Sequence, residues 1–210
     1  MKRLNILWIG LISVLMTACY DDYEKDYDKS SVYFASQKPL RTLVADTDMS
    51  IKVGVAIGGK REVHTDDWAT FEIDPSLLDG TGLTLMPENY YQLANPNKMT
   101  ISNPNLAIAD VKVTFSDAFY EDNDALNKHY AIPFRLVDHN QDEISTDVNG
   151  NLKDYSIVVV KFVSQYHGTY FVKGKVTNLS TQQVTEYSNK DLSQNMTRDF
   201  VSLGRNKVQI

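Results

Sequence analysis

The chain has 210 residues, of which 42% are hydrophobic and 23% charged, a composition typical of a folded protein with one or two domains. Its net charge of −6 argues against nucleic-acid binding, because phosphate contacts need clustered lysine and arginine, and against electrostatic binding to anionic lipid. Twelve tyrosines and eight phenylalanines favour a β-rich fold.

Residues 1–18 have the parts of a secretory signal peptide. Lys2 and Arg3 precede an apolar run from Leu4 to Met16, and small residues lead to Cys19. The run is shorter than the roughly 20 residues that a membrane-spanning helix requires, and no basic flank follows it. The sequence therefore predicts that this segment is removed after export.

Cys19 is the only cysteine of the chain. A lone cysteine is commonly a small buried hydrophobic residue, but Leu15-Met16-Thr17-Ala18-Cys19 resembles the lipobox of bacterial lipoproteins. Met16 departs from that pattern, which more often has leucine, valine or isoleucine. We expect Cys19 to carry lipid that anchors the chain in the outer membrane of a Gram-negative bacterium, and no disulfide to form.

Residues 19–30 are acidic, polar and rich in tyrosine, as expected of a flexible tether. Asp21, Asp22 and Glu24 also resemble the acidic signal that directs lipoproteins of Bacteroidota to the outer leaflet. We therefore expect the protein to face the cell exterior.

Seven strands are expected between residues 31 and 163, from alternating apolar and polar residues and from strand-forming composition. They are Ser31–Ala35, Met49–Ile57, Trp68–Ile73, Lys98–Ile101, Asp110–Phe115, His129–Val137 and Tyr155–Val163. Short helical turns are expected at Pro75–Asp79 and Asn123–Asn127. Pro133 predicts that its strand lies at a sheet edge or bears a bulge. Seven short strands separated by turns favour an all-β fold, an immunoglobulin-like antiparallel β-sandwich.

Residues 164–210 begin a new strand pattern, with apolar residues at Tyr170, Val172 and Val176. They are too few to form an independent core without disulfides or metal. We expect them to be the beginning of a second, truncated β domain, and Asn206–Ile210 to be a further strand. Packing of this segment on the first domain is the alternative.

Four motifs in the sandwich region carry a resemblance to a known family. They are Phe71–Leu78, Leu85–Leu93, Tyr130–Val137 and Tyr155–Val160. In this order the chain resembles an N-terminal domain of unknown function in Bacteroidota surface lipoproteins. That domain occurs in accessory proteins of polysaccharide-utilisation systems and ahead of family 18 endo-β-N-acetylglucosaminidases. The resemblance implies an immunoglobulin-like fold and brings no catalytic residue. Two loops depart from the family pattern, at Asp79–Thr84 and Ser102–Asn105.

No enzyme activity, cofactor or metal is expected. A glycosidase needs two carboxylates that flank the scissile bond. The acidic pairs of this chain lie in polar segments and are expected to be solvated: Asp21-Asp22, Asp66-Asp67, Glu121-Asp122 and Asp142-Glu143. His139 near Asp142 and Glu143 is the one imaginable metal cluster, and a solvated surface is its ordinary explanation. Nucleotide-binding and serine-nucleophile motifs are absent from the sequence.

Binding is the remaining chemistry. Sugars stack on exposed aromatic rings while polar side chains bind their hydroxyls. Trp68, beside Asp66 and Asp67, is the first candidate ligand-binding residue, although a core anchor is the ordinary explanation for such a tryptophan. Tyr90 is the second, because Tyr91 falls on a tyrosine of the family motif.

The sequence thus predicts a non-catalytic surface lipoprotein that binds or presents glycans in a polysaccharide-utilisation system, beside an outer-membrane importer complex. One alternative is an N-terminal spacer domain of a longer glycoside hydrolase. Another is a structural or adhesive surface protein whose sheet edge accepts a donor strand.

Overall fold

The computed structural model describes residues 29–210, except 48, 61–62 and 104. The predicted signal peptide, Cys19 and nearly all of the predicted tether lie outside the described residues. At the end of that tether, Ser30 donates hydrogen bonds from its amide and its hydroxyl to Asp142 Oδ2, each at 2.7 Å. No helix among the described residues is long and apolar enough to cross a membrane.

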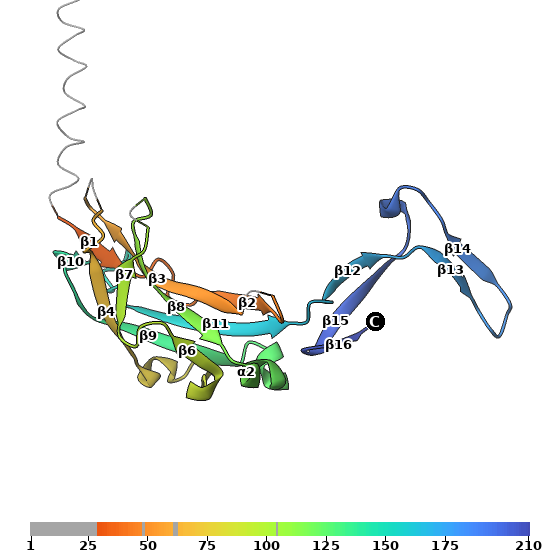
Figure 1. Cartoon of the computed structure of the whole chain (residues 1–210), viewed down its shortest axis with the longest axis horizontal. Helices are drawn as coiled ribbons and strands as arrows, with labels where there is room; N and C mark the ends of the chain where they lie inside the picture. Colours follow the sequence, from red (N-terminus) through yellow and green to blue (C-terminus); the bar gives the residue numbers. More distant parts are fainter. Residues whose placement is uncertain (1–28, 48, 61–62, 104) are drawn as a thin grey trace, which may run out of the picture.

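The described residues before Ser164 form one curled sheet, with the strand order β10-β1-β3-β8-β7-β4-β9-β11-β2 (Figure 1). Two short strands branch from it, β5 beside β9 and β6 beside β8. The strands are β1 Ser31–Tyr33, β2 Leu40–Val44, β3 Ser50–Gly58, β4 Trp68–Ile73, β5 Thr84–Leu85, β6 Tyr91–Leu93, β7 Lys98–Ile101, β8 Ile108–Phe115, β9 Tyr130–His139, β10 Glu143–Ile144 and β11 Tyr155–Val163. The helical segments are η2 Pro75–Leu78, η3 Glu88–Tyr90, α2 Asp117–Glu121 and η4 Asn123–Leu126.

This strand order confirms the predicted all-β, immunoglobulin-like fold. Strands β1, β3, β8 and β7 make one layer and β4, β9, β11 and β2 the other, as in the two sheets of an immunoglobulin domain. Strand β7 joins the layers because it pairs with both β8 and β4. Most pairs are antiparallel as predicted, but β1–β10, β2–β11 and β5–β9 are parallel.

Strand β11 is covered on both of its faces. Val158, Val160 and Phe162 enter the main core between the layers. Ile157 and Val159 pack on the other face, in a second cluster with Leu78 and Ala131. A strand buried on both faces has a continuous apolar run instead of alternation, which explains the sequence Ile-Val-Val-Val at 157–160.

Pro133 lies inside the sheet, so the expectation of an edge strand is wrong. Strand β9 pairs with β4 on one side and with β11 on the other. Ile157, opposite Pro133, donates its amide away from β9 to Gln37 O at 2.8 Å. The proline nitrogen therefore points toward β4, near where that strand ends at Ile73, and few ladder bonds are affected. Strand β9 does bear a bulge, but at Val137.

The sequence does not predict α2, whose five residues are too few for a periodic pattern. Phe119 in this helix is fully buried and lies at the centre of an aromatic cluster. Its ring centroid is 5.0–6.2 Å from those of four other rings, Tyr90, Phe115, Tyr120 and Phe162. The cluster joins α2 to β8 and β11 and closes one end of the core.

Two small sheets follow Val163 and extend away from the sandwich (Figure 1). One contains β12 Gly168–Phe171, β15 Thr197–Gly204 and β16 Lys207–Gln209, and the other β13 Gly174–Thr177 and β14 Val184–Tyr187; η5 Leu192–Gln194 lies between them. Arg205, in the turn after β15, pairs with Asp46 at 2.6 Å and with Asp117 at 2.8 Å. These two ion pairs connect the turn after β15 to the sandwich.

Candidate functional site

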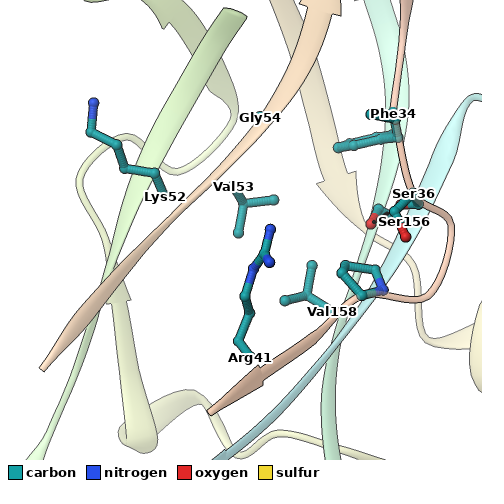
Figure 2. A pocket seen from close by; sticks show the side chains of 10 residues that line it. Phe34, Ser36, Arg41, Lys52, Val53, Gly54, Ser156 and Val158 are labelled. Carbon is teal, nitrogen blue, oxygen red and sulfur yellow. Dashed lines mark hydrogen bonds between the residues drawn. The ribbon is translucent and has the colours of Figure 1, made fainter. Parts of the chain in front are cut away.

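A groove opens where β2 and β3 diverge, and we call it the edge groove (Figure 2). It consists of two adjoining hollows of about 110 and 360 Å³, whose walls share Ala35, Arg41, Lys52 and Gly54. The smaller hollow is also lined by Phe34, Ser36, Pro39, Val53, Ser156 and Val158. The larger adds residues of β8 and of the preceding loop: Ser102, Asn103, Leu106, Ile108 and Asp110.

Of the two cations in the edge groove, Lys52 has polar partners and Arg41 has none among the described residues. Lys52 Nζ lies 3.0 Å from Asp110 Oδ2 and donates to Ser102 Oγ at 3.2 Å. Arg41 extends into the smaller hollow between Val53 and Val158 (Figure 2). Its guanidinium forms no hydrogen bond or ion pair with any other residue that the structure describes. Leu106 and Ile108 supply an exposed apolar wall.

Gly54 has a steric role in this site. A Cβ atom there would lie 2.5 Å from the carbonyl oxygen of Ala109 and 2.9 Å from Asp110 Cβ. Only glycine allows β3 to approach β8 this closely without displacing backbone. The groove wall is therefore bare backbone at this point.

The strand register places Trp68 on the outer sheet face, which carries the larger hollow of the edge groove. Trp68 is paired with Thr100, Thr100 with Asp110, and Asp110 with Gly54. Directly paired residues of antiparallel strands point to the same face. We call these four residues the cross-strand row. At roughly 4.8 Å per strand, the row spans about 14 Å.

Trp68 is a half-buried residue of the outer face and does not belong to the core. Its strand neighbour Ala69 is the one that points inward, so the core-anchor explanation does not hold. Lys98 Nζ lies 4.9 Å from the centroid of the indole ring. The Trp68 amide donates to Asn140 Oδ1 at 2.9 Å, which holds the start of β4 in place.

Tyr90 lies at the end of η3, away from the edge groove, and its ring packs against the core. Its hydroxyl donates to Asp122 Oδ2 at 3.1 Å, and Tyr130 donates to the same oxygen at 2.6 Å. Its ring lies edge-on to Tyr130 and Phe119. Desolvation and the Asp122 carboxylate raise the pKa of Tyr90. The expectation that Tyr90 is a free aromatic residue is thus not met, and it does not join the cross-strand row.

Asp67 is buried, so the expectation that the Asp66-Asp67 pair is solvated is wrong for its second member. Its carboxylate accepts hydrogen bonds from Lys60 Nζ at 2.7 Å, Gln141 Nε2 at 2.9 Å and the His64 amide at 2.9 Å. Burial raises the pKa of Asp67, but these hydrogen bonds outweigh it and bring the pKa below its ordinary value. The network joins the loop before β4 to the loop after β9.

No group of three or more histidine, cysteine or acidic side chains gathers at one point among the described residues. His139 Nδ1 is instead 3.0 Å from the carbonyl oxygen of Gln141, and Asp142 is bonded to Ser30.

Sequence reasoning did not identify Arg41, Lys52, Thr100 or Asp110 as site residues. Lys52, Asp110 and Thr100 come from strands far apart in the chain, and the pairing of β3, β8 and β7 brings them together. Arg41 lies on β2, which pairs with β11, and it reaches the others across the groove. The alternation of Met49–Ile57 does place Lys52 and Gly54 on the polar face of a strand. This alternation is the sequence signal that points to these two residues.

A family model described as "-like, N-terminal domain" matches residues 27–143, more than half of the chain. The chain belongs to this family. The match confirms the N-terminal domain that the four motifs indicate, and it covers the sandwich up to β10. A search of curated proteins finds no match.

Among the similar solved structures, one supports the fold of this chain. A protein of unknown function from Bacteroides ovatus is 22% identical, with a TM-score of 0.70 over 85% of this chain and 67% of that one. A second such protein from the same species is 15% identical, with a TM-score of 0.46 over 86% of this chain and 61% of that one. EndoBT-3987 of Bacteroides thetaiotaomicron, solved with a Man5GlcNAc product, is 21% identical, with a TM-score of 0.42 over 64% of this chain and 32% of that one.

Proposed function

We propose that the protein is a non-catalytic, surface-exposed lipoprotein that binds glycans along the cross-strand row and the edge groove. One observation carries the proposal: the register that aligns Trp68 with Thr100, Asp110 and the groove wall at Gly54. An aromatic ring then lies at one end of a polar surface and a hollow at the other. Sugar chains need this combination, since their C–H faces stack on rings and their hydroxyls bind polar side chains.

The carboxylates of this surface favour binding over hydrolysis. Glycosidases use two carboxyl groups, about 5–10 Å apart, that flank the scissile bond. Within the part of the chain that the structure describes, Asp110 is the only carboxylate that lines either hollow of the edge groove, and it is paired with Lys52. A lone, ion-paired carboxylate suits the binding of hydroxyls.

Trp68→Ala is the test of the glycan-binding surface. Affinity electrophoresis of the full chain in mild detergent, against host and plant glycans, is expected to show retardation by at least one of them. The alanine variant is expected to lose about tenfold in affinity for that glycan, because a stacked ring is worth up to about 1.5 kcal/mol. Phe171→Ala, at an exposed ring of β12, is the matched control. Retardation by no glycan, or equal retardation of Trp68→Ala and wild type, would contradict the proposal.

The membrane anchor is part of the same proposal and rests on Cys19 and the acidic residues that follow it. Cys19→Ser is expected to move the protein from the membrane fraction to the soluble fraction, because no thiol remains to accept lipid. Protease accessibility on intact cells measures whether the anchored wild type faces the exterior, next to an importer complex. A Cys19→Ser chain that stays with the membrane would exclude lipid on this residue as the anchor.

A spacer for a catalytic module is the second candidate function. The small sheets after Val163 favour it, because they expose apolar side chains suited to packing against a further module; among them are Tyr170, Phe171, Val176, Val201 and Leu203. The chain also spans 67% and 61% of the two Bacteroides ovatus proteins described above.

A further inference from the structure

Arg41 is the cation of the edge groove that has no partner among the described residues. Arg135 and Arg205 each hold two carboxylates, Asp74 with Asp154 and Asp46 with Asp117. Arg41 enters the smaller hollow without forming any such contact with the other described residues (Figure 2).

The charges around Arg41 do not cancel. Of the described residues, two cations, Arg41 and Lys52, and one carboxylate, Asp110, line the two hollows. Lys52 and Asp110 neutralise each other at 3.0 Å, which leaves the positive charge of Arg41. This positive groove belongs to a chain whose net charge is −6. The local charge is thus opposite to that of the whole molecule.

We infer that the edge groove binds the carboxylate of an acidic sugar residue and that Arg41 is its direct ligand. The inference rests on the proposed glycan-binding function and names the class of glycan. A guanidinium presents two parallel N–H donors that match the planar carboxylate, a pairing roughly twice as strong as neutral hydrogen bonds. Ser36, Asn103 and Ser102 line the same hollows and offer partners to the ring hydroxyls.

The exposed position of Arg41 also suits an exchangeable ligand. The hollow opens between β2, the last strand in the order of the described sheet, and the part of β3 beyond its pairing with β1, which involves Ala56–Gly58. A glycan can therefore enter from solvent without displacing a strand. From this point the cross-strand row leads toward Trp68, so a chain held at Arg41 can reach the indole ring.

The test is affinity electrophoresis of the full chain in mild detergent. The acidic probes are polygalacturonate, alginate, hyaluronan and polysialic acid, each also as its methyl ester; the other probes are neutral mannan and dextran sulfate. We expect retardation by at least one acidic glycan and its loss on esterification. Arg41→Gln is expected to weaken that binding about tenfold or more, and Arg41→Lys less. Lys38→Gln, an exposed cation just before β2, is the matched control.

Three other outcomes of this test would contradict the inference. Binding to mannan or to methyl esters alone, unchanged in Arg41→Gln, would overturn the inference and leave the proposed function standing. Retardation by none of the glycans would overturn both. Equal retardation by dextran sulfate and the acidic glycans, insensitive to Arg41→Gln, would show unspecific attraction and also overturn the inference. An unchanged melting temperature of Arg41→Gln shows that its effect is local.

Discussion

Replacing Phe119 by alanine is expected to lower the free energy of unfolding by about 3–5 kcal/mol. The side chain is fully buried and contacts four aromatic rings, so alanine removes apolar contact and leaves a cavity that rigid neighbours cannot fill. Urea unfolding followed by tyrosine and tryptophan fluorescence measures the change. Because α2 and β11 meet at this ring, the loss affects the whole sandwich.

The control for Phe119→Ala is the same substitution at Phe171, whose side chain is about half exposed at 51%. Surface substitutions change the free energy of unfolding by about 0.5 kcal/mol or less. Similar losses for the two variants would mean that the ring cluster around α2 does not close the core.

Replacing Lys60 by methionine is expected to lower the free energy of unfolding by about 3 kcal/mol near neutral pH, the low end for a broken buried ion pair. Lys60 Nζ is the cation at 2.7 Å from the Asp67 carboxylate, whose residue is only 3% exposed. The variant leaves that carboxylate buried with two neutral donors. Lys38→Met, at an exposed lysine, is the matched control and is expected to unfold like the wild type.

The cost of Lys60→Met is expected to depend on pH. In the wild type the pKa of Asp67 lies below the ordinary 3.8. The stabilisation by the network is therefore fully present above about pH 5 and is lost as the pH falls through the folded pKa. Urea midpoints of wild type and variant are expected to converge toward pH 3. A difference that stays constant from pH 7 to pH 3 would exclude the ion pair as its cause.

The sequence predicts the regular strands well because their pattern is local. Trp68–Ile73, Lys98–Ile101 and Tyr155–Val163 have the predicted bounds, and each has the composition of a strand. The short elements β2, β5, β6 and β10 are missed because alternation over two to five residues is a weak signal, although the four residues of β7 were enough. Pro133 was wrong as an edge marker, since the direction of its nitrogen depends on the register of two neighbouring strands.

In the candidate site, too, residue types can be read from the sequence, whereas contacts between distant residues cannot. Trp68 can be chosen from the sequence by its residue type, but its partners cannot, because they lie on β7, β8 and β3. Asp67 and Tyr90 looked free in the sequence because Gln141, Asp122 and Tyr130, which hold them, come from other parts of the chain. A hydrogen bond between distant residues leaves no local pattern.

The sequence by itself determined the all-β class, the positions of the long strands and the family, and it supplied the N-terminal pattern from which the lipid anchor at Cys19 is proposed. These properties depend on composition, alternation and short motifs, which neighbouring residues carry. Tertiary structure alone decided that Trp68 faces outward, that Asp67 is buried and that Arg41 meets Lys52 and Asp110 in one groove. Strand pairing fixes these contacts, and pairing is chosen by the packing of the whole core.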